Sequence, residues 1–203
     1  MLSRLRAVWG RLMGPLADGL LRLGVTPDQV TIGGTVVSVA LALWLFPTGH
    51  LFLGAILLGV FTVLDTIDGL MARRSGHSGP WGAFLDSTLD RFADGAIFAG
   101  LVLWYTGRGT DRLTAILALA CLVLGAIVPY ARARAEGLGM TANVGIAERG
   151  DRILVSLVAA GLVGLGVTRV LLTVALGLLA AASLVTVVQR MLVVRRQVRE
   201  AAS

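Results

Sequence analysis

The chain has 203 residues, of which 56% are hydrophobic and 15% charged, and its mean hydropathy is +0.84. Soluble domains carry about 25% charged residues, so this composition excludes an ordinary soluble domain and indicates an integral membrane protein. The single cysteine, Cys121, excludes a disulfide within the chain. The net charge of +6 comes from arginine without any lysine. We interpret this charge as a bias toward anionic lipid headgroups, not toward nucleic acid.

Residues 1–24 are expected to form an amphipathic helix on the membrane surface. Apolar side chains recur there at helical spacing, with arginines elsewhere on the helical wheel, a pattern typical of interfacial helices. The stretch "TPDQVT" then begins the first span, with Thr26 as its cap and Pro27 in the first turn. The apolar positions are Leu2, Leu5, Trp9, Leu12, Leu16 and Leu20.

Six further stretches are predicted to cross the bilayer as helices. The sequence therefore predicts an all-α integral membrane protein with a single domain. Residues 26–192 would form a six-helix bundle and residues 193–203 a cytoplasmic tail. The predicted spans are Val30–Phe46, Leu51–Met71, Ala83–Tyr105, Leu113–Tyr130, Ile153–Val167 and Val170–Leu192.

The arginines predict the orientation of these spans. Fourteen of the 18 arginines lie before the first span, at or beyond the end of the sixth, or in the connectors that follow the second and fourth. Because positive residues are retained on the cytoplasmic side, we expect both termini in the cytoplasm and the protein in the cell membrane.

Four aspartates lie where lipid is the expected solvent. Asp65 and Asp68 share a face of the second span, and Asp86 and Asp90 share a face of the third. Asp94 extends the second stripe by one turn. A short connector makes the two spans antiparallel neighbours, so the carboxylates face one another at the cytoplasmic end. Four such acids cannot all stay ionised without cations, and Mg²⁺ or Mn²⁺ prefers oxygen ligands.

The alternative is that these acids pair with Arg73 and Arg91 and only hold the bundle together. Two arginines cannot neutralise four carboxylates, so a metal site is the preferred interpretation.

The stretch from Asp65 to Asp90 resembles the signature of the CDP-alcohol phosphotransferases. The matching positions are Asp65, Asp68, Gly69, Ala72, Arg73, Gly82, Asp86 and Asp90. This resemblance implies a CDP-linked lipid held at a site with two Mg²⁺ ions, Mn²⁺ being possible. An acceptor hydroxyl would attack the β-phosphate, and CMP would leave.

The resemblance also implies individual roles. Asp65, Asp68 and Asp86 would bind metal, and Asp90 would both bind metal and accept the proton of the hydroxyl. Further residues would contact the CDP-lipid: Asp28, Gln29, Val30, Thr31, Gly69, Arg73, Ser78 and Gly79.

Arginines at the cytoplasmic ends of the last three spans are candidates for binding an anionic acceptor. Arginine suits planar recognition of phosphate. They could equally be topology determinants that keep their charged groups at the interface. The candidates are Arg132, Arg134, Arg149, Arg152 and Arg190.

The stretches "YARARAEGLG" and "GIAERGDRILV" resemble the actinobacterial phosphatidylinositol-phosphate synthases within this family. The resemblance implies CDP-diacylglycerol and inositol 1-phosphate as substrates, and a homodimer. Pro129 and Arg132 stand where that subgroup tends to have serine and lysine. Phosphatidylglycerophosphate synthase, with glycerol 3-phosphate as acceptor, therefore stays an alternative.

A divalent-cation transporter or sensor is the non-enzymatic alternative. It would require polar residues that continue toward the outer face. The outer halves of the second and third spans, "LFLGAILLGVF" and "AIFAGLVLWY", contain neither acids nor amides. The sequence thus favours a site that is closed on the outer side.

Overall fold

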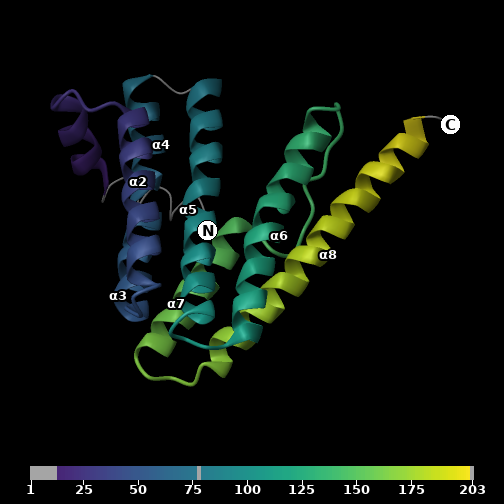
Figure 1. Ribbon diagram of the computed structural model, residues 1–203. Coiled ribbons are helices and arrows are strands. Elements are labelled where there is room, and N and C mark those ends of the chain that lie inside the picture. Colours follow the sequence, from purple (N-terminus) through teal and green to yellow (C-terminus); the bar gives the residue numbers. More distant parts are fainter. Residues whose placement is uncertain (1–12, 77–78, 202–203) are drawn as a thin grey trace.

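The structure is a computed structural model that describes residues 13–76 and 79–201 (Figure 1). Every regular element in these two ranges is a helix, which confirms the all-α class. Residues 13–22 are helical. The elements that follow are α2 (Pro27–Leu45), α3 (Leu51–Leu64), α4 (Thr66–Ser75), α5 (Pro80–Thr106), α6 (Arg112–Glu136), α7 (Arg149–Gly164) and α8 (Val170–Ala201).

Within the described residues, four helical segments are long and apolar enough to cross a membrane: Pro27–Leu45, Leu51–Ser75, Arg112–Glu136 and Val170–Ala201. The other two predicted spans lie in α5 and α7, which fall short of this standard for different reasons. The sequence of α5 includes several charged side chains, and α7 has only 16 residues. The charges in α5 are the ones that build the site described below.

The helices form two groups that splay apart toward one end (Figure 1). One group contains α2, α4 and α5, and the other contains the inclined pair α6 and α8. Near the opposite end, α3 packs against α7, and α5 packs against α6. The shared apolar core there includes Phe46, Phe98 and Leu101. Small residues allow close helix contact in lipid: a Cβ at Gly100 of α5 would lie 2.5 Å from the Ala42 carbonyl oxygen of α2.

The second predicted span is interrupted at Asp65, which the sequence did not indicate. Helix α3 ends at Leu64 and α4 begins at Thr66. Asp65 keeps helical dihedral angles, and its N–H donates to the Phe61 carbonyl oxygen at 2.9 Å. The two helices therefore run on from one another, with an irregular turn at this carboxylate.

The helix at residues 13–22 packs on α4. Ala17 is buried together with Ile67 and Met71 of α4. Arg74 fixes the contact, because its guanidinium lies 2.6 Å from the Asp18 carboxylate and also donates to the Gly14 carbonyl oxygen. The remainder of the predicted amphipathic helix, residues 1–12, lies outside the described residues.

Helices α6 and α8 extend beyond their predicted spans. Helix α6 continues through Pro129 to Glu136, and α8 continues to Ala201, so residues 193–201 of the predicted tail are helical. One side of this extended α8 holds the loop at residues 137–148. The Thr186 hydroxyl accepts the N–H groups of Ile146 and Ala147, and Gln197 bonds to Thr141.

Candidate metal centre and flanking cavities

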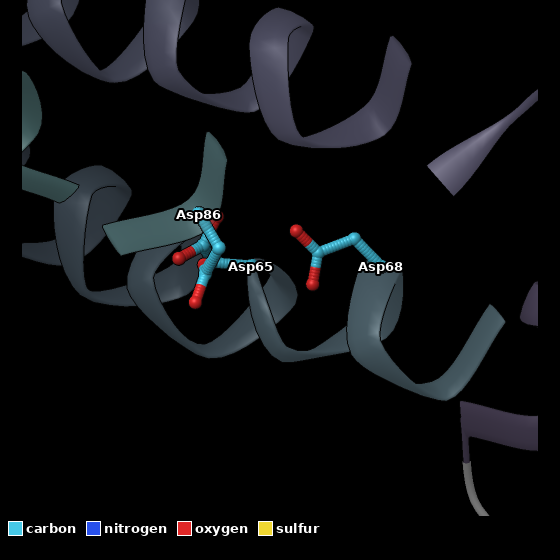
Figure 2. A group of neighbouring side chains, drawn as sticks. All are labelled: Asp65, Asp68 and Asp86. Atoms are coloured by element: carbon cyan, nitrogen blue, oxygen red, sulfur yellow. The ribbon is translucent and has the colours of Figure 1, made fainter. Parts of the chain in front are cut away.

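Three aspartates converge where α4 meets the first half of α5. Asp65, Asp68 and Asp86 each offer a carboxylate oxygen, and these oxygens lie within 4.8 Å of one another. Figure 2 shows the three side chains pointing toward a common space. Asp65 comes from the junction of α3 and α4, Asp68 from the first turn of α4, and Asp86 from the antiparallel helix α5.

The surroundings of this cluster fit divalent cations. The buried Asp68 carboxylate accepts a hydrogen bond from the Thr31 hydroxyl at 2.5 Å and another from the Gly69 N–H. Within residues 13–76 and 79–201, the carboxylates of Asp65 and Asp86 have neither an ion-pair nor a hydrogen-bond partner. Carboxylates this close repel one another when ionised. An all-oxygen donor set of this kind suits Mg²⁺ or Mn²⁺.

Asp90 lies one turn beyond Asp86 and outside this group of three. Its Oδ1 is 2.7 Å from Nη2 of Arg149, and its Oδ2 is 3.6 Å from Nη2 of Arg91. The fourth aspartate therefore stands between the carboxylate cluster and a group of arginines.

A cavity of about 590 Å³ opens on one side of the cluster, within the usual size range of ligand pockets. It brings together most residues predicted to contact the CDP-lipid. Gln29 and Val30 do not line it: Gln29 caps α2 together with Thr26, and Val30 packs against the helix at residues 13–22. Ser78 lies outside the described residues. The predicted residues that line this first cavity are Asp28, Thr31, Asp68, Gly69, Arg73, Gly79 and Asp86.

Trp81 is a lining residue that the sequence reasoning missed. It is 61% exposed and its indole Nε1 donates to Asp28 Oδ2 at 2.8 Å, which ties the start of α5 to the start of α2. The signal available in the sequence was an aromatic residue directly before Gly82 of the signature.

A second cavity of about 330 Å³ is lined in part by Arg149, the partner of Asp90. Glu148 is the one acid among its lining residues, so the cavity is strongly cationic. Arg134 was predicted to bind the acceptor but does not line this cavity. Arg91 was not predicted to bind the acceptor, yet it does line the cavity. The five arginines of this second cavity are Arg91, Arg132, Arg149, Arg152 and Arg190.

Backbone carbonyls hold two of these arginines in place. Arg152 is only 2% exposed, and its Nη1 donates to the Ala147 carbonyl oxygen at 3.1 Å. Arg190 donates to the carbonyl oxygens of Val128 and Val144. These neutral acceptors fix the guanidinium groups without cancelling their charge.

A carboxylate cluster that could hold divalent cations, beside a ligand-sized cavity and near a cationic one, suits phosphoryl transfer, which depends mainly on positioning and electrostatic stabilisation. Fold and site together define a membrane-embedded phosphotransferase.

The chain belongs to the CDP-alcohol phosphatidyltransferase family, whose model matches residues 24–146. It is therefore a transferase that uses a divalent metal, Mg²⁺ or Mn²⁺.

Relatives of known activity match almost the whole chain. The phosphatidylinositol phosphate synthase of Cutibacterium acnes is 49% identical over 97% of this chain and 98% of its own length. That of Streptomyces avermitilis is 47% identical over 97% of this chain and 83% of its own length.

A solved structure shows the same fold. The crystal structure of Mycobacterium tuberculosis phosphatidylinositol phosphate synthase with CDP-DAG bound has a TM-score of 0.87 and 45% identity, covering 91% of this chain and 94% of that one. The same enzyme in complex with manganese and citrate gives a TM-score of 0.85 at 45% identity, covering 89% of this chain and 87% of that one.

Proposed function

We propose that this protein transfers the phosphatidyl group of CDP-diacylglycerol to a hydroxyl of inositol 1-phosphate, forming phosphatidylinositol phosphate and CMP. The observation that carries the proposal is a pair of cavities, with Asp90 one turn from Asp86 of the first and paired with Arg149 of the second. One adjoins the carboxylate cluster and the other is lined by five arginines. Relatives of this activity at 47–49% identity over nearly the full chain support it.

The first cavity would hold the CDP portion of the lipid. Arg73 would pair with a phosphate through two parallel N–H bonds, and Gly69 would let the nucleotide approach the backbone of α4. Asp28, Thr31 and Gly79 line the same space. The set proposed to contact the CDP-lipid also includes their neighbours in the sequence, Gln29, Val30 and Ser78.

The aspartates would hold two metal ions, Asp65, Asp68 and Asp86 as a group and Asp90 from the adjacent turn. When bound, such ions neutralise phosphate oxygens and stabilise the leaving group. Asp90 would take the proton of the acceptor hydroxyl, since it lies one turn from Asp86 and pairs with Arg149 of the second cavity.

The second cavity would bind the phosphate of the acceptor. Arg132, Arg149, Arg152 and Arg190 line it, and Arg134 lies on the adjacent last turn of α6. A cavity this cationic favours an anionic acceptor over a neutral one.

An assay in detergent micelles tests this function. Purified protein is given Mg²⁺, CDP-diacylglycerol and, in separate reactions, inositol 1-phosphate, free inositol or glycerol 3-phosphate, and CMP release is measured. We expect turnover with inositol 1-phosphate only, and its loss when the metal is chelated. Faster turnover with glycerol 3-phosphate would assign the protein to phosphatidylglycerophosphate synthesis. Equal turnover of inositol and inositol 1-phosphate would contradict the arginine cavity.

We also propose that α5 and α7 cross the membrane, which gives six spans with both termini and the site on the cytoplasmic side. The packing of both helices within the bundle and the distribution of arginines support this topology. The helix at residues 13–22 would lie at the cytoplasmic surface. The resemblance to a commonly dimeric family supports a homodimer, which the mass of the protein–detergent complex would test.

A further inference from the structure

Asp94 is a buried carboxylate to which the proposed reaction gives no role. It lies on α5 one turn beyond Asp90, on the same face, and is 6% exposed. Both of its carboxylate oxygens accept hydrogen bonds from Nε of Arg149, each at 3.1 Å. Its Oδ2 is also 3.6 Å from Nη2 of Arg91. The main partner of Asp94 is therefore an arginine on another helix, 55 residues along the chain.

The three guanidinium nitrogens of Arg149 have different surroundings. Nε faces Asp94, while Nη2 lies 3.1 Å from Asp94 Oδ1 and 2.7 Å from Asp90 Oδ1. Nη1 has no hydrogen-bond or ion-pair partner among the residues that the structure describes. Because Arg149 lines the second cavity, that remaining nitrogen is available to an anion held there.

Arg149 therefore both pairs with Asp90 and lines the cavity proposed for the acceptor phosphate. A free arginine side chain has many rotamers, and a carboxylate that engages Nε restricts them. Asp94 engages Nε with both oxygens, so it fixes the plane of the guanidinium. With Asp94 in place, Nη2 reaches Asp90 while Nη1 stays directed away from both acids.

We propose that Asp94 is a positioning residue that holds Arg149 between Asp90 and the phosphate of the acceptor. The inference rests on the proposed function and extends it. Asp94 thereby sets the separation between the acceptor phosphate and the carboxylate that takes the hydroxyl proton. An acceptor is selected when its phosphate and its hydroxyl match this separation.

A purely structural role for Asp94 makes a different prediction. If Asp94 only balanced the buried charge of Arg91 and Arg152, its loss would lower stability and affect both substrates alike. If it acts through Arg149, its loss affects the acceptor side alone. The Michaelis constants for the two substrates separate these roles.

The test compares Asp94→Asn, Asp94→Glu and the wild-type enzyme in the CMP-release assay. We expect Asp94→Asn to raise KM for inositol 1-phosphate and Ki for inorganic phosphate by about 10- to 100-fold, as for groups that orient a ligand. KM for CDP-diacylglycerol should stay within about twofold, and Asp94→Glu should recover part of the loss. Glu200→Gln, on the exposed end of α8, is the control for removing an acid.

A double-mutant cycle with Arg149→Lys tests whether the effect passes through Arg149. In Arg149→Lys the Nε contact is absent, so adding Asp94→Asn should raise KM for the acceptor little further. Additive effects, or equal rises in both KM values, would overturn the proposal. If the wild-type enzyme does not use inositol 1-phosphate, the proposed function fails. Calorimetric titration of the wild-type and Asp94→Asn proteins with inorganic phosphate then decides the role of Asp94, because equal affinities would refute it.

Discussion

Asp90 differs from the three aspartates that form the carboxylate cluster. It is paired with Arg149, whereas Asp65 and Asp86 have no partner within the described ranges. Its position one turn from Asp86 lets it accept a proton beside the cluster without being essential for binding metal.

We therefore expect Asp90→Asn to lower turnover by about 10²- to 10⁴-fold, the usual contribution of a general base. Binding of Mn²⁺, followed by electron paramagnetic resonance, should persist because Asp65, Asp68 and Asp86 remain. Retained CMP release would remove Asp90 from the role of base. Loss of Mn²⁺ binding would make it an indispensable ligand.

A substitution at Gly69 should change substrate binding without lowering the stability of the protein. It lies inside α4, where glycine is less favourable than alanine by up to about 1 kcal/mol. A Cβ at this position would have its nearest neighbour, Nη1 of Arg73, at 3.4 Å, an ordinary contact. The fold thus accepts alanine at this position, but Gly69 lines the first cavity, so we expect the added methyl group to narrow it.

Gly69→Ala should therefore leave the Tm unchanged or raise it, and should raise KM for CDP-diacylglycerol about tenfold or more. Gly59→Ala in α3 is the matched control, because a Cβ there meets nothing within 4 Å. A lower Tm with unchanged KM would contradict this reading of Gly69.

Helix α8 organises the second cavity from a distance. The Thr186 hydroxyl accepts two backbone N–H groups of the 137–148 loop, from Ile146 at 3.1 Å and Ala147 at 3.2 Å. Arg190, one turn further along, donates to the Val144 carbonyl oxygen of the same loop. The arginine cavity is thus closed by a loop whose position depends on a single helix.

Thr186→Val keeps the shape of the side chain but removes the acceptor, and an unsatisfied buried N–H costs about 1–3 kcal/mol. We expect a lower Tm and a higher KM for the acceptor, with KM for CDP-diacylglycerol nearly unchanged. Thr106→Val is the control, because that hydroxyl bonds only within α5. An equal rise in both KM values would show that the loop does not act on the acceptor side alone.

Sequence periodicity could predict the contacts that lie within one helical hairpin. The spacing of Asp65, Asp68 and Asp86 on neighbouring helices was enough to bring their carboxylates together. The contact of Asp90 and Asp94 with Arg149 was not predictable in this way, because it joins helices far apart in the chain. Nor did the sequence indicate the interruption at Asp65, since the length of the apolar stretch from Leu51 to Met71 predicts one continuous span.

Helix ends were predicted less well than helix existence. The spans were drawn to the limits of apolar sequence, so the charged final turns of α6 and α8 were left outside. Those turns are helical as far as Glu136 and Ala201, and they support the arginine cavity and its loop. Polarity marks where a membrane ends, not where a helix ends.

At the scale of the whole molecule, the proposed topology of six spans would place the Arg108 connector outside the cell and the end of α8 in the cytoplasm. Single cysteines at Arg108 and Ala201, introduced after Cys121→Ala, test this with a membrane-impermeant maleimide. We expect Arg108→Cys to react in intact cells and Ala201→Cys to react only after permeabilisation. The reverse pattern would invert the topology, and labelling of both in intact cells would exclude an odd number of spans between the two residues.

The two cavities have no lining residue in common, and Asp90 lines neither of them. Both substrates can therefore be bound at the same time, and the phosphatidyl group need not be transferred to the protein first. The expected kinetics are sequential: double-reciprocal plots at several fixed acceptor concentrations should intersect, and parallel lines would instead indicate a covalent intermediate. A single inhibitor that joins a cytidine diphosphate to a phosphorylated polyol would then occupy both cavities at once. It should bind more tightly than the cytidine diphosphate or the phosphorylated polyol alone.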